Sequence, residues 1–468
     1  MTSTVELVIQ NGLVYTSKGP VRAGIAIDNE KIVSISKETH LPSANKTIDA
    51  EGKIIIPGIV DVHSHIRDLE TAYKEDYEHA SKAAAAGGIT MHVDMPNVKP
   101  PTTTVQRFLE KKSLAEKQVI VDFNMFPSAS VVEEIPALSD LGILGYKAFM
   151  IADIVRDYPH MPEIGIKGLG HLLDMFKAVA KTKLPIVVHP HSQDIATYID
   201  HEIWKELGTG PLAYFEADIR YDSLNKTVGV SNLIQLARVT NVRLNITHMD
   251  KARPIQLLRE AKASGATNIT ADAHPGSVFV TREVVEKLGP LPLGVGSTLQ
   301  DREAVWIGWN EGTIDIITSE HAPHTQEEKK IGWENMWKAP GGWGSEMQEM
   351  LPLFLTQINN GRMTLETFIT LTSLNPAKIF GVYPKKGEIS IGSDADLTVI
   401  DMKKESVISN DNCYSKCGYS PYDGMKVKGI PVYTICRGKV VMDSGEIIAK
   451  PGNGRFQPRL NWEDQKNR

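Results

Sequence analysis

The middle of this chain alternates between short apolar runs and segments with helical periodicity. Eight apolar runs end at polar residues, and helix-like segments such as 75–86, 168–182 and 253–264 lie between them. Strands that alternate with helices are typical of parallel sheets built from β-α-β units. Eight such units predict an α/β protein with a (β/α)8 TIM-like barrel, whose functional residues gather at the carboxyl ends of the strands. The runs are 54–62, 89–94, 119–126, 144–150, 185–189, 242–248, 267–272 and 314–318.

The two ends of the chain have a different texture. Short alternating strands separated by turn residues fill residues 5–36 and recur over residues 395–442. Two β-rich ends that bracket an α/β middle predict one small β-sandwich domain assembled from both termini. We expect residues 1–55 and 385–468 to form this small domain and residues 56–384 to form the barrel.

Composition and charge exclude several classes of protein. The net charge of -6 gives no basic footprint of the kind that nucleic-acid-binding proteins carry. No apolar run approaches the roughly 20 residues that span a bilayer, and the start lacks a basic segment followed by an apolar core. Cys413 and Cys417 are interpreted as incidental thiols, because no second pair completes a metal site. We expect a cytoplasmic protein that binds neither nucleic acid nor membranes.

Candidate metal ligands stand where several of the apolar runs end. His63 and His65 follow the first run, and one intervening residue places both imidazoles on one face of a strand, about 6–7 Å apart. His189 ends the fifth run, His248 ends the sixth, and Glu320 follows the eighth. A single strand-end histidine is more often a hydrogen-bonded barrel residue. Four of them with a carboxylate at one barrel mouth favour a site for zinc or a similar divalent metal.

These and other motifs resemble the amidohydrolase superfamily, in its cyclic-amidase branch of dihydroorotases, allantoinases and hydantoinases. The resemblance covers nearly the whole chain and is specific for the branch rather than for one member. It implies a hydrolase that opens a cyclic amide or ureide C–N bond by attack of metal-bound hydroxide. The motifs are Pro57-Gly-Ile-Val-Asp-Val-His-Ser-His, Ala83-Ala-Ala-Ala-Gly-Gly-Ile-Thr, Asp94-Met-Pro-Asn, Gly145-Tyr-Lys-Ala-Phe-Met, Glu320-His-Ala-Pro-His and Gly387-Glu-Ile-Ser-Ile-Gly-Ser-Asp-Ala-Asp-Leu.

Carried over position by position, the resemblance implies two divalent metal ions, with zinc as the leading identity. His63 and His65 would hold the more buried ion, and His189 and His248 the more exposed one. Lys147 would react with CO2 to give N6-carboxylysine, whose two oxygens bridge the ions. A desolvated, neutral amine can react in this way. The alternative, a snorkelling surface lysine, is disfavoured because Lys147 lies in an apolar strand.

Position 320 departs from the family pattern, in which an aspartate stands where this chain has Glu320. The resemblance implies that this carboxylate binds the buried metal and acts as general acid and base, passing a proton to the leaving nitrogen. The added methylene requires the metal or the water to shift, or one metal to be absent. Alternatively, Glu320 orients His321 or His324 by hydrogen bonding. The roles of His191 and His274 stay open.

Two polar residues beyond the first two runs suggest a substrate site. Arg67 and Asn97 resemble the pair with which dihydroorotases hold a substrate carboxylate, because a guanidinium fork matches two oxygens. A salt bridge from Arg67 to Asp68 or Glu70 is an equal alternative.

Other loops differ from the family, and residues 150–153 lack the tyrosine that is usual in hydantoinases. We expect a small cyclic amide as substrate, allantoinase- or dihydroorotase-like activity, and a homo-oligomer (a dimer or a tetramer). Hydantoinase- or dihydropyrimidinase-like activity and a metal-poor, non-catalytic relative are the alternatives.

Overall fold

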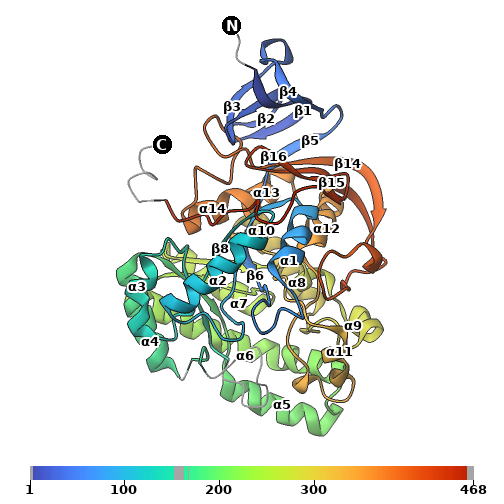
Figure 1. Ribbon diagram of the computed structural model, residues 1–468. Helices are drawn as coiled ribbons and strands as arrows, with labels where there is room; N and C mark the ends of the chain where they lie inside the picture. The colour runs from blue at the N-terminus through green and yellow to red at the C-terminus, as the bar shows by residue number, and fades with distance from the viewer. Residues whose placement is uncertain (1–3, 152–162, 167, 461–468) are drawn as a thin grey trace.

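Strands from both ends of the chain share one sheet in this computed structural model, which describes residues 4–151, 163–166 and 168–460. They are Val5–Thr16 (β1), Gly19–Asp28 (β2), Lys31–Ser36 (β3), Ala44–Asp49 (β4), Ile54–Pro57 (β5), Leu397–Val407 (β14), Lys426–Cys436 (β15), Lys439–Asp443 (β16) and Glu446–Ile447 (β17). The nine strands run in the order β17-β16-β15-β14-β5-β1-β2-β3, with β4 beside β1. Figure 1 shows the blue strands of the N-terminal end above the red strands of the C-terminal end.

Eight short strands of the middle segment form two parallel sheets. They are Ile59–Ser64 (β6), Ile89–Asp94 (β7), Asp122–Met125 (β8), Tyr146–Phe149 (β9), Pro185–His189 (β10), Arg243–Ile246 (β11), Ile269–Ala273 (β12) and Ile316–Ile317 (β13). One sheet has the order β6-β7-β8 and the other β13-β12-β11-β10-β9. Isolated parallel bridges connect the two sheets at both seams, between Ser64 and His321 and between Ser128 and Lys147. The parallel strands and their intervening helices confirm the α/β class.

The predicted helices are present with small shifts at their ends. The segments 75–86, 168–182 and 253–264 become α1, α4 and α7. The Asp76 side chain caps α1 by accepting a hydrogen bond from the His79 N–H. Among the described residues, no helix is long and apolar enough to cross a membrane. The α-helices are Tyr77–Ala86 (α1), Val105–Gln118 (α2), Ile135–Ser139 (α3), Leu169–Thr182 (α4), Gln193–Leu207 (α5), Pro211–Thr240 (α6), Ala252–Ala263 (α7), Gly276–Phe279 (α8), Arg282–Leu288 (α9), Leu299–Glu311 (α10), Gln326–Lys329 (α11), Met347–Asn359 (α12), Leu365–Ile369 (α13) and Asn375–Phe380 (α14).

The first apolar run is two strands, so the single strand predicted over 54–62 is wrong. The run passes from the nine-stranded sheet, where β5 ends, to the parallel sheet, where β6 begins. Gly58 stands at the crossing, and its N–H donates to the Asp396 carbonyl at 2.9 Å. A Cβ atom at Gly58 would lie 2.2 Å from Thr90 Oγ1, so only glycine fits without movement of its neighbour. The run therefore joins the two parts of the fold.

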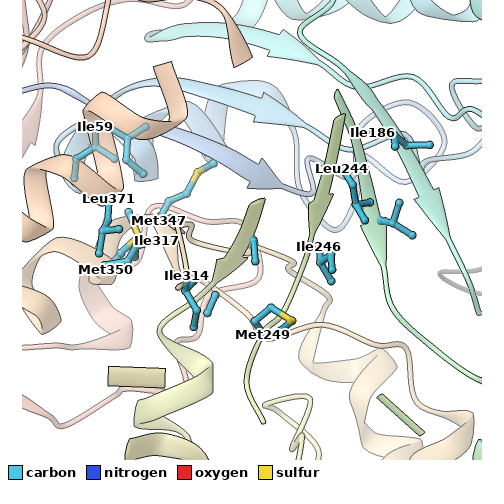
Figure 2. Packing of buried hydrophobic residues seen from close by; sticks show 14 of the residues in the cluster. Ile59, Ile186, Leu244, Ile246, Met249, Ile314, Ile317, Met347, Met350 and Leu371 are labelled. Carbon is cyan, nitrogen blue, oxygen red and sulfur yellow. The ribbon is translucent and has the colours of Figure 1, made fainter. Parts of the chain in front are cut away.

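Side chains of the parallel strands alternate between two apolar layers. Ile186 of β10 packs in the large outer cluster with Leu244 and Ile246 of β11 (Figure 2). Val187 instead belongs to a smaller inner cluster. Lys147 of β9 pairs in parallel register with Val187, and neighbours in register point to the same side of a sheet. The strand period therefore directs the Lys147 side chain inward, away from the covering helices.

Candidate active site

The four predicted histidine ligands form one cluster at the carboxyl ends of β6, β10 and β11. The ring centres of His63 and His65 lie 5.3 Å apart. The centre of the His248 ring lies 4.8 Å from that of His63 and 4.7 Å from that of His189. Both nitrogens of His63 are buried and have no hydrogen-bond partner among the described residues. Buried imidazoles without such partners fit a group that binds a metal.

Lys147 lies beside this cluster with its ammonium group fully buried. Its Nζ has no hydrogen-bond partner within the described chain and lies 5.0 Å from the centre of the Phe149 ring. Burial lowers the pKa of Lys147 to about 8, against the opposing charges of Asp272 and Glu320. An amine that readily becomes neutral fits the chemistry of carbamate formation.

Glu320 contacts the histidine cluster through its Oε2 atom. That oxygen lies against His248 Nδ1 and 3.7 Å from His274 Nε2. Its two alternative partners lie in other contacts: His321 Nε2 is 3.3 Å from a Glu75 oxygen, and His324 Nε2 is 2.9 Å from the Gly341 carbonyl. The carboxylate is therefore directed at the strand-end histidines.

The backbone at two of these residues is left-handed. The φ angle is 57° at His248 and 51° at Glu320. A non-glycine residue in this region costs on the order of 1–3 kcal/mol, and such residues cluster at functional sites. Two hydrogen bonds hold the strained positions: Glu320 N–H donates to the His63 carbonyl at 2.9 Å, and His248 N–H to Asp272 Oδ1 at 3.4 Å.

Asp272 is a site residue that the sequence analysis did not identify. Its Oδ1 lies 3.6 Å from His63 Nδ1, and its Oδ2 accepts a hydrogen bond from Asn245 at 2.6 Å. Burial raises the pKa of Asp272 to about 7, although the charge of Lys147 opposes this. The sequence signal for Asp272 was the two-residue period of the strand. The alanines on either side of it face the outer cluster, so Asp272 points to the inner side.

Asp61 was also not identified from the sequence. It joins β6, which carries His63, to the segment that carries Glu320. Its Oδ1 accepts the N–H groups of Ser319 at 3.0 Å and of His63 at 3.3 Å, and its Oδ2 accepts the Ser319 hydroxyl. Burial raises the pKa of Asp61 to about 6. The carboxylate fixes β6 against the segment that precedes Glu320. Asp61 therefore orients the candidate ligands and is not one of them.

The ligand atoms come together in three overlapping groups, each with its atoms within 4.8 Å of one another. The first combines two predicted histidines with the predicted carboxylate. The other two add residues that the sequence analysis left unassigned. The groups are His63, His65 and Glu320; His63, His248 and Asp272; and His248, His274 and Glu320. Nitrogen and carboxylate donors of this kind suit zinc and related divalent ions.

A cavity of about 170 Å³ opens onto the cluster and is lined by both predicted substrate residues. Arg67 is buried, its Nε donates to the Pro323 carbonyl at 3.2 Å, and one terminal nitrogen lies 3.2 Å from His324 Nε2. Asn97 Oδ1 lies 2.7 Å from His65 Nδ1. If this carbonyl accepts the His65 proton, Nε2 of the same ring keeps its lone pair for a ligand.

His191 also lines the cavity, and its Nδ1 lies 3.1 Å from the Asn225 amide nitrogen. Part of the loop 150–153, which lacks the hydantoinase tyrosine, lies outside the described residues.

Three comparisons place this geometry among known proteins. The model of the Amidohydrolase family matches residues 54–441. An L-hydantoinase of Paenarthrobacter aurescens is 32% identical, across 98% of this chain and 100% of the relative. A dihydroorotase of Methanosphaera stadtmanae is 33% identical, across 90% of this chain and 94% of the relative. The solved structure of an L-hydantoinase (dihydropyrimidinase) from Arthrobacter aurescens matches with a TM-score of 0.91 and 31% identity, across 97% of this chain and 100% of that chain.

Proposed function

This chain belongs to the amidohydrolase family, and we propose that it is a metal-dependent hydrolase that opens a C–N bond in a cyclic amide or ureide. One observation carries the proposal: four strand-end histidines meet beside the buried Lys147 amine, which has no hydrogen-bond partner in the described part of the chain. Burying a polar group without a hydrogen-bond partner costs free energy. A relative that had lost catalysis would therefore gain nothing by keeping such groups.

The proposed centre has two divalent ions, with zinc as the leading identity. Its protein ligands are His63, His65, His189, His248, Glu320 and Lys147 as N6-carboxylysine. Addition of the neutral Lys147 amine to CO2 would release one proton and give a carbamate, whose two oxygens could bind the ions. When bound, two such ions polarise a ring carbonyl and lower the pKa of a water molecule.

The other side chains of this site transfer protons and orient the ligands. The Glu320 carboxylate accepts the proton of the attacking water and returns it to the leaving ring nitrogen. Asn97 holds His65 in one tautomer through its Nδ1, and Asp61 holds the backbone of His63. These hydrogen bonds fix the ligands before substrate arrives, which is how a site avoids reorganising during the reaction.

The leading substrate class is a hydantoin- or dihydropyrimidine-type cyclic ureide. Support comes from the L-hydantoinase relatives, which match almost the full length of this chain in sequence and in structure. Allantoin, a substituted hydantoin, belongs to this class. The cavity also has a wall suited to an uncharged ring, since Tyr214, Trp337 and Trp343 line it.

A ring that carries a carboxylate, such as dihydroorotate, is the second candidate. The observation that favours it is the buried guanidinium of Arg67 in the cavity wall. Arg67→Met should raise KM for a carboxylated ring far more than for a neutral ring, because removing one partner of a desolvated charge pair costs about 2–5 kcal/mol. Equal effects on both kinds of ring would exclude this candidate.

A hydrolysis screen tests the proposed function. The purified protein, loaded with zinc, manganese or cobalt, is given dihydroorotate, allantoin, dihydrouracil and substituted hydantoins, and ring opening is followed by loss of ultraviolet absorbance. We expect at least one ring to be opened, with activity lost on chelation and restored by metal. If no ring is opened under any metal condition, the proposed function is wrong.

We also propose that the eight parallel strands close into one (β/α)8 barrel beside a β-sandwich domain. The proposed domains are 1–55 with 385–468, and 56–384, and β5 carries the nine-stranded sheet two residues past the first boundary, to Pro57. The bridges at Ser64 and Lys147, one at each seam, support closure. Limited proteolysis tests the boundaries, since a cut between the two parts should leave a resistant fragment close to 56–384. The cytoplasmic location and the dimer or tetramer stay predictions.

A further inference from the structure

His274 lies in the loop that follows β12, outside the set of ligands proposed above. Its Nε2 is 3.7 Å from Glu320 Oε2, and its ring centre is 5.9 Å from that of His248, with the two rings nearly perpendicular. The candidate ligand atoms of His274, His248 and Glu320 lie within 4.8 Å of one another. The three side chains therefore converge on one point at the cluster.

The ring of His274 is held in this orientation by close packing. It lies 4.8 Å from the Trp343 ring, measured between ring centres. On another side it approaches Gly276 so closely that an added Cβ would lie 2.6 Å from His274 Cε1. A glycine is therefore needed for the ring to occupy this position. A side chain fixed on two sides is pre-organised to bind, since little rotamer freedom remains to be lost.

Hydrogen bonding does not account for the burial of His274. The side chain is 2% exposed, and its Nδ1 has no hydrogen-bond partner among the described residues. No hydrogen bond at Nδ1 therefore compensates for the burial of this ring beside two candidate ligands. The nitrogen that faces Glu320 is Nε2, and a cation at the point of convergence would bind there.

The identity of residue 320 explains why a further histidine is useful here. The carboxylate of Glu320 stands one methylene further from the backbone than the aspartate of the family pattern. It belongs both to the group with His63 and His65 and to the group with His248 and His274. The longer side chain thus reaches the side of the cluster where His274 lies.

We propose that His274 is a metal ligand of this chain, and that it holds one of the two divalent ions together with His248 and Glu320. The inference rests on the proposed function, because it presupposes a divalent-metal centre at the cluster. It adds a nitrogen donor from the loop after β12. It also means that Glu320 binds the ion that His248 binds.

The test measures metal binding directly. Wild type, His274→Ala and His274→Asn are stripped with a chelator and titrated with Zn²⁺ against a competing chromophoric chelator. Both variants should bind the second ion at least about 100-fold more weakly, since losing even an outer-shell partner costs roughly 10–100-fold. The asparagine variant keeps a polar side chain of intermediate size. Equal losses of Zn²⁺ affinity in the two variants would therefore come from the missing ligand and not from lost packing. Thermal melts check that both variants fold.

His191→Ala is the matched control. It also removes an imidazole from the cavity wall, but from a ring that contacts the Asn225 amide. We expect it to bind two Zn²⁺ ions with wild-type affinity. Co²⁺ substitution gives a second readout, because loss of a nitrogen ligand should shift the visible absorption of the bound ion in the His274 variants and not in the control.

A double-mutant cycle with Glu320→Asp makes the inference sharper. If Glu320 and His274 bind one ion, their effects on Zn²⁺ affinity are non-additive, and His274→Ala should cost less in the Glu320→Asp background. If wild type binds two ions and the His274 variants bind them equally well, His274 is not a ligand, and the proposed hydrolase function is unaffected. Should wild type bind no divalent ion, both are wrong.

Discussion

Lys147 and Lys386 are both buried in this protein, and their surroundings differ sharply. The Lys386 ammonium lies 2.5 Å from Asp396, 2.8 Å from Asp122 and 3.1 Å from Asp394. Although burial alone would lower it, the charges of Asp396 and Asp394 hold the pKa of Lys386 above its ordinary value. Burial instead lowers the pKa of Lys147 to about 8. One lysine is kept charged, and the other is kept ready to lose its proton.

The position of each lysine explains the difference. Lys386 and Arg437 both contact Asp122 of β8, and Arg437 directly follows β15 of the nine-stranded sheet. This ion cluster joins the two parts of the fold. Lys147 lies on the inner side of β9, beside the strand-end histidines. We infer that the paired charge of Lys386 has a structural role, whereas the unpaired amine of Lys147 beside the histidines marks the place where chemistry occurs.

The largest expected effect is the loss of turnover in Glu320→Gln. This change keeps the size of the side chain and removes its basicity, and the loss of a general base lowers kcat by about 10²–10⁴-fold. Asp122→Asn is the contrasting variant, because its carboxylate belongs to the paired cluster. We expect it to lower the melting temperature and to leave the kcat of the folded enzyme near wild type. Wild-type turnover in Glu320→Gln would place the base elsewhere, with His191 of the cavity wall the next candidate.

The second prediction compares the two lysines themselves. Lys386→Met leaves its carboxylates buried without their cation, and breaking a buried pair costs about 3–5 kcal/mol of unfolding free energy. Lys147→Met in the metal-free protein removes a buried amine without a partner and should be neutral or stabilising. Urea unfolding of the stripped proteins measures both. Equal destabilisation by the two changes would contradict the contrast drawn here.

The third and smallest effect is a pH dependence of stability in the metal-free, CO2-free protein. The pKa of Lys147 is about 8 in the folded chain and ordinarily 10.5. Between these values the unfolded chain binds more protons, so the unfolding free energy should rise with pH. Subtracting the curve of Lys147→Met isolates this contribution. A difference that stays flat from pH 7 to 10.5 would show that the Lys147 amine is not desolvated. For Lys386, whose pKa is raised, the stabilisation is present below pH 10.5 and is lost only above it.

Local patterns in the sequence were sufficient to predict that the candidate ligands lie together at strand ends. His63, His189 and His248 each close an apolar run, and a parallel α/β arrangement brings such ends together. The same reasoning failed for the first run, because the chain crosses from one sheet to the other at Gly58. A Cβ atom there would clash with Thr90, and no local pattern encodes this close approach. Family membership, by contrast, followed from motifs that are themselves local.

Other site features depend on contacts between distant segments. Asp272 looks like any polar residue in a strand until the register of the sheet brings it within 3.6 Å of His63. His274 gains its orientation from Trp343, which lies far along the chain. The cluster around Lys386 joins Asp122 of β8 with Asp396, which directly precedes β14, and Arg437, which directly follows β15. Such groupings become visible only in three dimensions.

The central claim is that the unpaired amine of Lys147 becomes the bridge of a two-metal centre. Elemental analysis of purified wild type and Lys147→Ala, each with its hydrolytic activity, tests it most directly. The account predicts two divalent ions per chain in wild type. In Lys147→Ala it predicts fewer ions and no activity, both restored in part by a short carboxylic acid that supplies the missing bridging oxygens. Two ions and full activity in Lys147→Ala would contradict it.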